Sequence, residues 1–292
     1  MLRYPGGKEK LKKNIVEPIV CFYKNIKDGI DYEYREPFFG GGAIGLELIK
    51  KDLFSDIWIN DKDYSLCCFW TSIINEPDKV IDEIQKYKPT PENFSKIKSF
   101  LTKGNFENED PISIGVKKLI VHRTSFSGLG TMSGPLGGND QKGKYKNDSR
   151  WNPKYLTECV ISLNSYFKTK NIKNSSCTNL DCFEVLQDNT KKWFAYLDPP
   201  YYEMGDVLYP VKFTSRQHQE LSEILKNSNQ HWILSYDDCS QIRDLYSWAH
   251  IKEVEASYSI TGAKKKTELI IYPENIDFAF KISERFKTKE IF

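Results

Sequence analysis

The chain has 292 residues, enough for one large domain or two smaller ones. Charged residues make up 28% and hydrophobic residues 39%, which excludes a disordered chain and is typical of a globular protein. The net charge of +2 comes from 42 basic and 40 acidic residues, so the totals do not decide whether nucleic acid is a ligand.

No apolar run approaches the roughly 20 residues needed to cross a bilayer, and the first residues do not form a signal peptide. The 7 cysteines are odd in number and form no C-x-x-C pair, which favours reduced thiols in a cytosolic protein. The 4 histidines are scattered, so we expect no metal site. These features predict a cytoplasmic protein without a membrane partner.

The segment from Arg3 to Lys8 is turn-forming, and a lysine-rich amphipathic helix follows it to about Phe22. A phosphate-binding loop is excluded here because the G-x-x-x-x-G-K-[ST] spacing is absent and Glu9 replaces the hydroxyl residue. The lysines of the helix are typical of a solvated face.

A strand over residues 32–36, a glycine-rich turn to Gly45 and a helix over 46–50 predict the first unit of a nucleotide-binding α/β sheet. The full G-x-G-x-x-G pattern is missing, which favours a ligand other than a dinucleotide. A second strand over 57–61 ends in Asp61, about 20 residues after the glycines, where an acid commonly binds ribose hydroxyls. The alternative role for Asp61 is to cap the helix over 64–74.

Between residues 75 and 174 the alternation of strands and helices disappears, and helices are expected over 77–87 and 91–101. The long polar loop over 131–151 carries basic side chains with interleaved rings, which suits a nucleic-acid backbone and its bases. A solvated loop is the alternative. The candidate DNA-binding residues of the loop are Lys142, Lys144, Tyr145, Lys146 and Arg150.

The alternation then resumes with strands over 175–180 and 193–198, a helix over 215–225 and a strand over 232–236. The aromatic strand over 192–197 runs into Asp198, Pro199, Pro200 and Tyr201. Tandem prolines end a central strand, so a carboxylate, a carbonyl and a ring are held together at its carboxyl end, where α/β sheets bind ligands. The alternative role for Asp198 is a strand-end cap.

Strands over 251–258 and 268–272 are expected to pair as a final hairpin. Its expected tip carries Lys264, Lys265 and Lys266, which either grip phosphates or keep the hairpin from pairing with another strand edge.

These motifs, taken in order, resemble the Dam-type (class alpha, D12) DNA adenine N6-methyltransferases, which use S-adenosylmethionine. The resemblance spans nearly the whole chain: Leu2 to Lys8 looks like the family's opening segment, Glu36 to Gly42 like its glycine-rich motif, and Asp198 to Tyr201 like its catalytic tetrapeptide. Thr261 to Glu268 is similar to a late lysine-containing segment.

The resemblance implies a Rossmann-like α/β catalytic domain formed by residues 1–74 and 175–292. An inserted, mainly helical target-recognition domain over 75–174 would bind double-stranded DNA. Three further DNA contacts are implied where a segment resembles one that contacts DNA in relatives: Arg123, Ser125 and Ser127. Residues 134–152 depart from the pattern of the GATC-modifying members, so the recognition sequence is left open. A cognate restriction endonuclease, acting independently, is the further partner that the resemblance suggests.

The resemblance also implies that the cofactor is S-adenosylmethionine, with S-adenosylhomocysteine as product and no metal. Asp181 falls where the family places an acid near the cofactor's adenine. For Lys8, the alternative to a role at the cofactor is a surface charge. The expected cofactor-binding residues are Tyr4, Lys8, Glu36, Phe38, Phe39, Gly40, Gly42, Asp61, Asp181 and Asp198.

The expected mechanism starts from the exocyclic amine of adenine, a poor nucleophile whose lone pair is delocalised into the ring. The Asp198 carboxylate and the Pro199 carbonyl would accept its two hydrogens and hold the lone pair towards the methyl donor. The base would be flipped out of the duplex and stacked on Tyr201. The alternatives are an N4-cytosine or RNA amino methyltransferase, or a DNA-binding subunit of a defence complex that no longer turns over.

Overall fold

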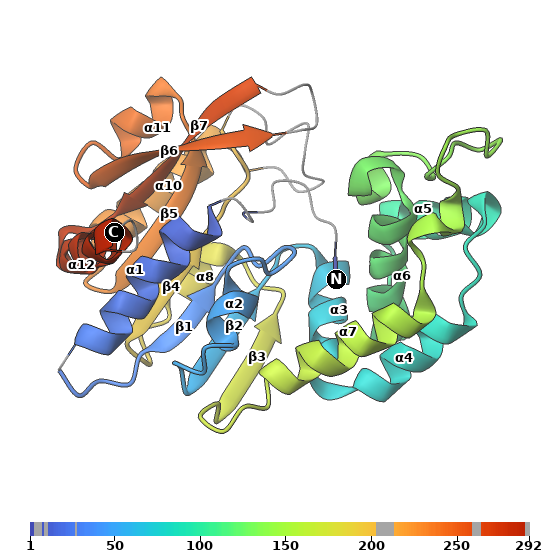
Figure 1. The fold of residues 1–292 in the computed structure, drawn as a ribbon, viewed down its shortest axis with the longest axis horizontal. Coiled ribbons are helices and arrows are strands. Elements are labelled where there is room, and N and C mark those ends of the chain that lie inside the picture. The colour runs from blue at the N-terminus through green and yellow to red at the C-terminus, as the bar shows by residue number, and fades with distance from the viewer. Residues whose placement is uncertain (3–7, 9–10, 27, 203–212, 259–263, 290–292) are drawn as a thin grey trace.

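The computed structural model describes residues 1–2, 8, 11–26, 28–202, 213–258 and 264–289. Within them a seven-stranded sheet runs in the order β3-β2-β1-β4-β5-β7-β6 (Figure 1). The first five strands in this order are parallel, and β7 is antiparallel to both β5 and β6. The strands are β1 (Glu33–Glu36), β2 (Asp56–Asn60), β3 (Asn174–Thr178), β4 (Trp193–Leu197), β5 (His231–Asp237), β6 (His250–Tyr258) and β7 (Lys264–Tyr272).

Helices cover both faces of this sheet because the buried strands are apolar on both sides. In β4, Phe194 and Tyr196 belong to one hydrophobic cluster, and Trp193, Ala195 and Leu197 belong to another. The first cluster includes side chains from α1 (Lys12–Asn25), α2 (Gly45–Ile49), α3 (Tyr64–Asn75) and α12 (Asp277–Lys289). The second includes side chains from α8 (Cys182–Gln187), α10 (Ser215–Lys226) and α11 (Ser240–Leu245). The predicted Rossmann-like α/β sheet is therefore confirmed.

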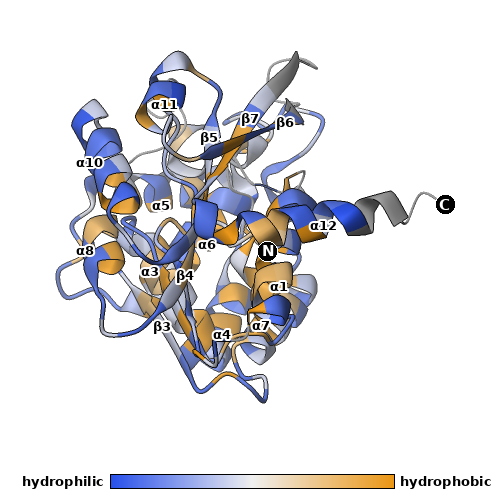
Figure 2. Ribbon diagram, turned by 90° about the vertical axis from the view of Figure 1, so that its left-hand side faces the viewer, coloured by the Kyte–Doolittle hydropathy of each residue, from blue (hydrophilic) through white to orange (hydrophobic). Residues whose placement is uncertain are grey.

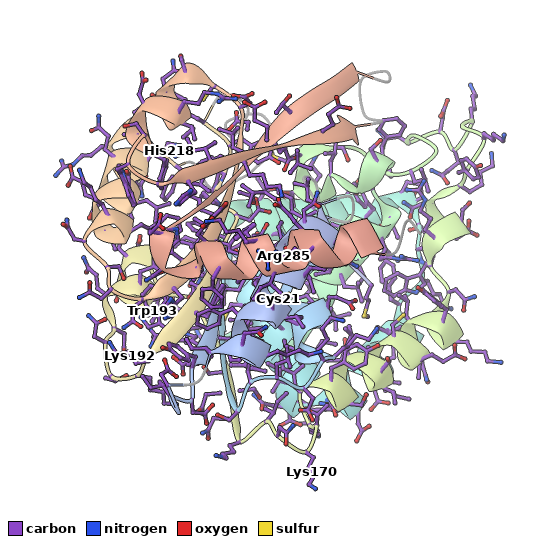
Figure 3. The ribbon with its side chains drawn as sticks, turned by 60° about the vertical axis from the view of Figure 1, so that its left-hand side comes forward. Cys21, Lys170, Lys192, Trp193, His218 and Arg285 are labelled. Carbon is purple, nitrogen blue, oxygen red and sulfur yellow. The ribbon has the colours of Figure 1, made fainter. Side chains whose placement is uncertain are left out.

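Helices α1 and α12 pack side by side on the first face. Figure 3 shows Cys21 of α1 next to α12, which carries Arg285. In Figure 2 the described part of α12 turns hydrophilic residues outward, while apolar residues of α1 and α12 face inward. This polarity matches the burial of Ile15, Ile19 and Phe280 beneath the two helices.

The segment between α3 and β3 is mainly helical, as the sequence predicts. Its described residues form α4 (Pro77–Lys86), α5 (Pro91–Lys103), α6 (Pro111–Thr124) and α7 (Pro153–Tyr166), with short 3-10 turns at Phe126–Gly128, Gly130–Met132 and Asn147–Arg150. Figure 1 places these helices together at one end of the molecule, beyond α3. A last 3-10 turn, Glu274–Ile276, precedes α12.

The starts of the helices in this segment follow from local sequence. Thr90, Asp110 and Asn152 each accept a hydrogen bond from a backbone N–H in the first turn, and each precedes a proline. A polar cap followed by proline is a favoured helix start, since proline lacks the N–H that would otherwise be unpaired. The division of the chain into a catalytic domain and an inserted recognition domain stays a prediction.

Candidate active site

The site lies where the direction of the sheet's crossovers reverses, between β1 and β4. These adjacent parallel strands continue in the chain to helices on opposite faces, α2 and α10. At such a switch point the two following loops diverge and leave room for a ligand. The loop after β1 is the glycine-rich turn, and the loop after β4 begins with Asp198. The two strongest motifs of the sequence are thus neighbours in space.

Asp198 is paired with a buried lysine from the start of the chain. The Lys8 Nζ lies 2.7 Å from Asp198 Oδ1, and the Lys8 side chain is only 1% exposed. The Ser235 hydroxyl, on β5, donates to the same oxygen at 3.0 Å. This burial rules out the interpretation of Lys8 as a surface charge. Asp198 likewise does more than end a strand, because charge and hydrogen bonds converge on it.

Tyr201 is joined to the same lysine. Its hydroxyl accepts a hydrogen bond from Lys8 Nζ at 3.0 Å and donates one to Glu268 Oε1 at 2.9 Å. Burial raises the pKa of Glu268 to about 7, the Lys8 charge opposes this rise, and the negative charge of Asp198 adds to it. Glu268 and Ser235 were not assigned roles from the sequence, since both reach the site only through the pairing of β5 with β4 and of β7 with β5.

The glycine-rich turn is held from both sides at Gly40. Its N–H donates to Asp61 Oδ2 at 2.7 Å, and its carbonyl accepts from the indole N–H of Trp70, on α3, at 2.9 Å. Gly40 and Gly42 have φ of 49° and 69°, which favours glycine. A Cβ on Gly42 would also lie 2.8 Å from the Phe39 ring. The turn therefore has one tight conformation, fixed by Asp61 and Trp70.

Asp61 is a buried carboxylate at the end of β2, and it is not the helix cap. Its Oδ1 accepts from the Asp63 N–H at 2.9 Å. Burial, together with the charge of Asp63, raises its pKa to about 7. The cap of α3 is Asp63, whose side chain accepts from the backbone N–H groups of Ser65 and Leu66. The alternative that the sequence left open for Asp61 is thus excluded.

Glu36 adds a third acid at the end of β1. It is 2% exposed and accepts a hydrogen bond from the Tyr34 hydroxyl at 2.7 Å. Burial raises its pKa well above the usual value, and the charges of Asp198 and Asp61 act in the same direction. Gly45 leaves the space that this carboxyl occupies, because a Cβ there would lie 2.2 Å from Glu36 Oε2.

Asp181 caps α8 and lies beside the same edge of the sheet. Its side chain accepts from the Phe183 N–H, and Lys62 lies 3.4 Å from its second oxygen. Phe183 also belongs to an aromatic group with Phe213 and Phe38, with ring centroids 6.1 and 5.8 Å from Phe213. The sequence singled out Phe38 but missed Phe183 and Phe213. Rings of this kind suit a planar ligand such as adenine.

The segment after α6 is a structured turn, and this corrects the expectation for Ser125. The Ser125 hydroxyl accepts from the Gly130 N–H at 2.9 Å, and Ser125 has no exposed surface, so it shapes the turn and does not face a ligand. Ser127 is exposed at φ 53°, and Phe126 beside it is 61% exposed. Arg123 is half-buried and donates to the Arg150 carbonyl at 2.8 and 3.1 Å.

The loop over residues 133–146 folds back on the same turn through Leu136, whose N–H donates to the Thr124 carbonyl at 2.8 Å. Its basic side chains remain at the surface, together with a tyrosine that is 55% exposed. Trp151 ends the polar loop, where the sequence predicts rings that face nucleic acid. It is instead only 7% exposed and packs against Tyr87. Arg150 is half-buried, and the exposed members of the set predicted in this loop are Lys142, Lys144, Tyr145 and Lys146.

The remaining predicted residues lie partly outside the described structure. Tyr4 and residues 261–263 are not among the described residues. The backbones of Lys264, Lys265 and Lys266 form the first part of β7 opposite the end of β6, so these lysines belong to the strand and not to a tip. Among the described residues, no helix is long and apolar enough to cross a membrane, and no cluster of potential metal ligands is found.

Comparison with protein families decides which chemistry this geometry belongs to. Residues 4–260 match the model of the D12 class N6 adenine-specific DNA methyltransferases. The chain belongs to this family. The matched range contains β1 to β6, the glycine-rich turn, Asp61, Asp198 and the helical segment between α3 and β3. The expected family and fold are therefore confirmed.

Relatives of this D12 methyltransferase include three Type II methyltransferases. M.MjaIII of Methanocaldococcus jannaschii is 27% identical over 232 residues, covering 76% of each chain. M1.LlaDCHI of Lactococcus lactis subsp. cremoris is 24% identical over 288 residues, covering 92% of this chain and 93% of its own. M.CviBI of Paramecium bursaria Chlorella virus NC1A is 24% identical over 227 residues, covering 77% and 80%.

Proposed function

We propose that the protein transfers a methyl group from S-adenosylmethionine to N6 of an adenine flipped out of duplex DNA, leaving S-adenosylhomocysteine. The observation that carries the proposal is the position of Asp198 at the sheet's switch point, paired with the buried Lys8 and beside the turn that Asp61 holds. An acid that can accept a hydrogen bond from an amine thus lies beside a turn that can hold a nucleoside-containing methyl donor, which suits methyl transfer from the donor to the amine. Membership in the D12 family supports the assignment.

The acidic residues of the site fit S-adenosylmethionine. The charges of Asp198 and Asp61 both act on Glu36, and a group of acids suits a ligand that carries a sulfonium and an ammonium group. Asp61 would accept hydrogen bonds from the ribose hydroxyls, since a carboxylate oxygen that already accepts a backbone N–H has further lone pairs. When bound, the cofactor supplies an electrophilic methyl group.

Lys8, Phe38 and the turn complete the proposed cofactor site. Lys8 would order the loop around the methionine end of the cofactor, because its ammonium group lies between Asp198 and Tyr201. The ring of Phe38, with Phe183 and Phe213, would flank the adenine of the cofactor. Asp181 at the cap of α8 is proposed to lie near the same adenine. The other proposed contacts are Tyr4, Glu36, Phe39, Gly40 and Gly42.

Asp198 would accept one hydrogen of the target amine and the Pro199 carbonyl the other. Among the described residues, the polar contacts of Asp198 fall on Oδ1, so Oδ2 is the oxygen that would accept from the amine. The carboxylate would then stabilise the positive charge that develops on nitrogen. The Tyr201 ring, fixed through its hydroxyl, would stack on the flipped base, a contact of about 1–3 kcal/mol.

The helical segment over 75–174 is proposed to recognise DNA. Its support is the surface formed by the exposed Ser127 and the exposed lysines of the loop, which suit phosphates. Arg123 would act by fixing the loop through the Arg150 carbonyl, and Lys264 to Lys266 would add contacts from β7. The names of the Type II relatives support a cognate restriction endonuclease as a separate partner.

The test is nucleoside analysis after incubation of the purified protein and S-adenosylmethionine with duplex DNA or RNA. The proposal requires N6-methyl-2'-deoxyadenosine in digests of the DNA. Detection of N4-methylcytosine or of a methylated ribonucleoside would show that the acceptor is the amine of cytosine or of RNA, and not N6 of adenine in DNA. If the digest contained no modified nucleoside and calorimetry detected no S-adenosylhomocysteine binding, the remaining interpretation would be a DNA-binding subunit that does not catalyse methyl transfer.

A further inference from the structure

A buried lysine on α6 contacts the cofactor side of the molecule. Lys118 is 4% exposed, and its Nζ lies 2.6 Å from Asp63 Oδ2. Asp63 follows β2 and caps α3, whereas Lys118 belongs to the helical segment proposed to recognise DNA. A buried ion pair of this kind needs a close and fixed approach of its two helices, because desolvation otherwise outweighs the attraction.

Gly115 provides that approach. A Cβ on Gly115 would lie 2.6 Å from both the Cα and the backbone N of Phe69, in α3, so the two helix backbones are in direct contact there. Lys118 lies three residues further along α6, on the same face of the helix as Gly115. The close crossing at Gly115 therefore directs the Lys118 side chain to the first turn of α3.

Asp63 connects this lysine to the glycine-rich turn. Its side chain binds Lys118, while its backbone N–H donates to Asp61 Oδ1 at 2.9 Å. The second oxygen of Asp61 accepts from the Gly40 N–H at 2.7 Å. A continuous series of hydrogen bonds thus runs from α6 to the turn that holds the proposed cofactor.

We infer that Lys118 is a positioning residue for the cofactor. Through Asp63 it holds Asp61, the proposed ribose ligand, in place, and its positive charge offsets the negative charges of Asp61 and Asp63. This inference rests on the proposed function, in which Asp61 accepts the ribose hydroxyls. Lys118 touches neither substrate nor cofactor, and it acts through Asp63. The role places the cofactor site under the control of a residue from the inserted helices.

The charges around Asp61 support a measurable effect of Lys118. Burial and the Asp63 charge raise the pKa of Asp61 to about 7, and Lys118 opposes the rise. For Asp63, burial acts to raise the pKa, and the Lys118 charge is the largest of the effects that lower it. The charged side chains that act on the pKa of Asp61 are Asp63 after β2 and Lys118 on α6. The charge of Asp61 in turn acts to raise the pKa of three groups that face it from other elements: Glu36 on β1, Cys67 on α3 and Cys177 on β3.

The test measures S-adenosylhomocysteine affinity by calorimetry between pH 6 and pH 9 in the full-length protein. Lys118→Met leaves two carboxylates facing each other without a cation, so the pair keeps a proton to higher pH. We expect affinity to decline at a pH about one unit higher than in the wild type, with about a tenfold loss near neutrality. The matched control is Lys117→Met, the adjacent lysine that pairs with Glu109, which should leave the profile unchanged.

A second variant gives a shift of the opposite sign. Asp63→Asn keeps a side chain that caps α3 but leaves Lys118 acting on Asp61 without the opposing negative charge. Affinity should then persist to lower pH than in the wild type. A purely structural role for Lys118 would weaken binding equally at every pH, and it would not produce opposite shifts in the two variants.

The outcomes separate this inference from the proposed function. If the wild type does not bind S-adenosylhomocysteine, or if Asp61→Ala binds it as well as the wild type does, the proposed site is wrong. If both of those tests succeed but Lys118→Met and Asp63→Asn do not shift the profile in opposite directions, the role of Lys118 is wrong. Should Lys118→Met fail to fold, the downward shift in Asp63→Asn alone decides, and its absence overturns the inference.

Discussion

Lys8 Nζ and Asp198 Oδ1 lie 2.7 Å apart, so the start of the chain supplies the cation for the acid at the centre of the sheet. The same lysine donates to the Tyr201 hydroxyl at 3.0 Å. An acid that is to accept a hydrogen bond from an amine in a buried site must stay fixed and charged. The pairing with Lys8 holds the carboxylate in place, and it makes Lys8 part of the site.

The first prediction concerns this pair. Lys8→Met should abolish most DNA methylation and lower the free energy of unfolding by about 3 kcal/mol, since it leaves Asp198 unpaired in a largely buried place. The double variant with Asp198→Asn should recover much of that stability without recovering activity. Denaturant unfolding of the two single variants and the double variant gives the coupling energy. Additive effects on stability would mean that the pair is not formed.

The second prediction concerns the pH dependence of cofactor binding. Burial raises the pKa of Asp61 to about 7, and the ionised form is the better acceptor for ribose hydroxyls. Affinity for S-adenosylhomocysteine should therefore reach its highest value above pH 7, where Asp61 is ionised, and should fall as the pH drops below 7. Calorimetry from pH 5.5 to pH 9 checks this, and Asp61→Ala should bind weakly with a flatter profile. Affinity that rises on acidification would contradict the assignment.

The third prediction is that a cationic ligand releases protons from the site. Burial raises the pKa of Glu36 well above its usual range and that of Glu268 to about 7, so both tend to hold protons in the absence of a ligand. A sulfonium favours their ionised forms, so S-adenosylmethionine should release more protons on binding than S-adenosylhomocysteine, whose sulfur is uncharged. Calorimetry in two buffers of different ionisation enthalpy measures the difference. Equal proton release by both ligands would show that these acids do not sense the sulfonium.

The fourth prediction concerns the exposed lysines of the loop. Replacing Lys142, Lys144 and Lys146 together by alanine should weaken DNA binding and lower the slope of log affinity against log salt by about 0.9 for each phosphate that is no longer neutralised. Cofactor affinity should not change, because in the described part of the chain these side chains contact only residues of their own loop. The matched control replaces Lys79 and Lys86 of α4, which form surface pairs with neighbouring acids. If both sets lowered the slope equally, the loop would not be the DNA-binding element.

Much of the fold follows from local sequence signals. The strands that lead to Asp61 and Asp198 were predictable because short apolar runs end in an acid, and the prolines after Asp198 fix where β4 stops. The starts of α5 and α10 were predictable from their caps. Asp63, however, caps α3 in place of Asp61, a choice between acids two residues apart that depends on the backbone path and cannot be read from composition.

The candidate site was predictable where residues adjoin a motif and not where contacts are long-range. Trp70 holds the Gly40 carbonyl, and Lys118 reaches Asp63, through the packing of α3 and α6. Nothing in the local sequence distinguishes Lys118 from Lys117, although one is buried and the other is paired near the surface. The prediction for Ser125 was wrong for the same reason, since its place inside the turn depends on Gly130.

The most direct test of the proposed chemistry is methyl transfer by an Asp198→Ala variant. Its activity on duplex DNA is measured with labelled S-adenosylmethionine, beside cofactor affinity by calorimetry. The matched control is Asp238→Ala, an acid after the neighbouring strand β5 that pairs with Arg243 at the surface. We expect Asp198→Ala to lose methylation by at least about a hundredfold and to retain measurable cofactor binding, while the control stays fully active. Wild-type rates of methylation by Asp198→Ala would contradict the role proposed for this acid.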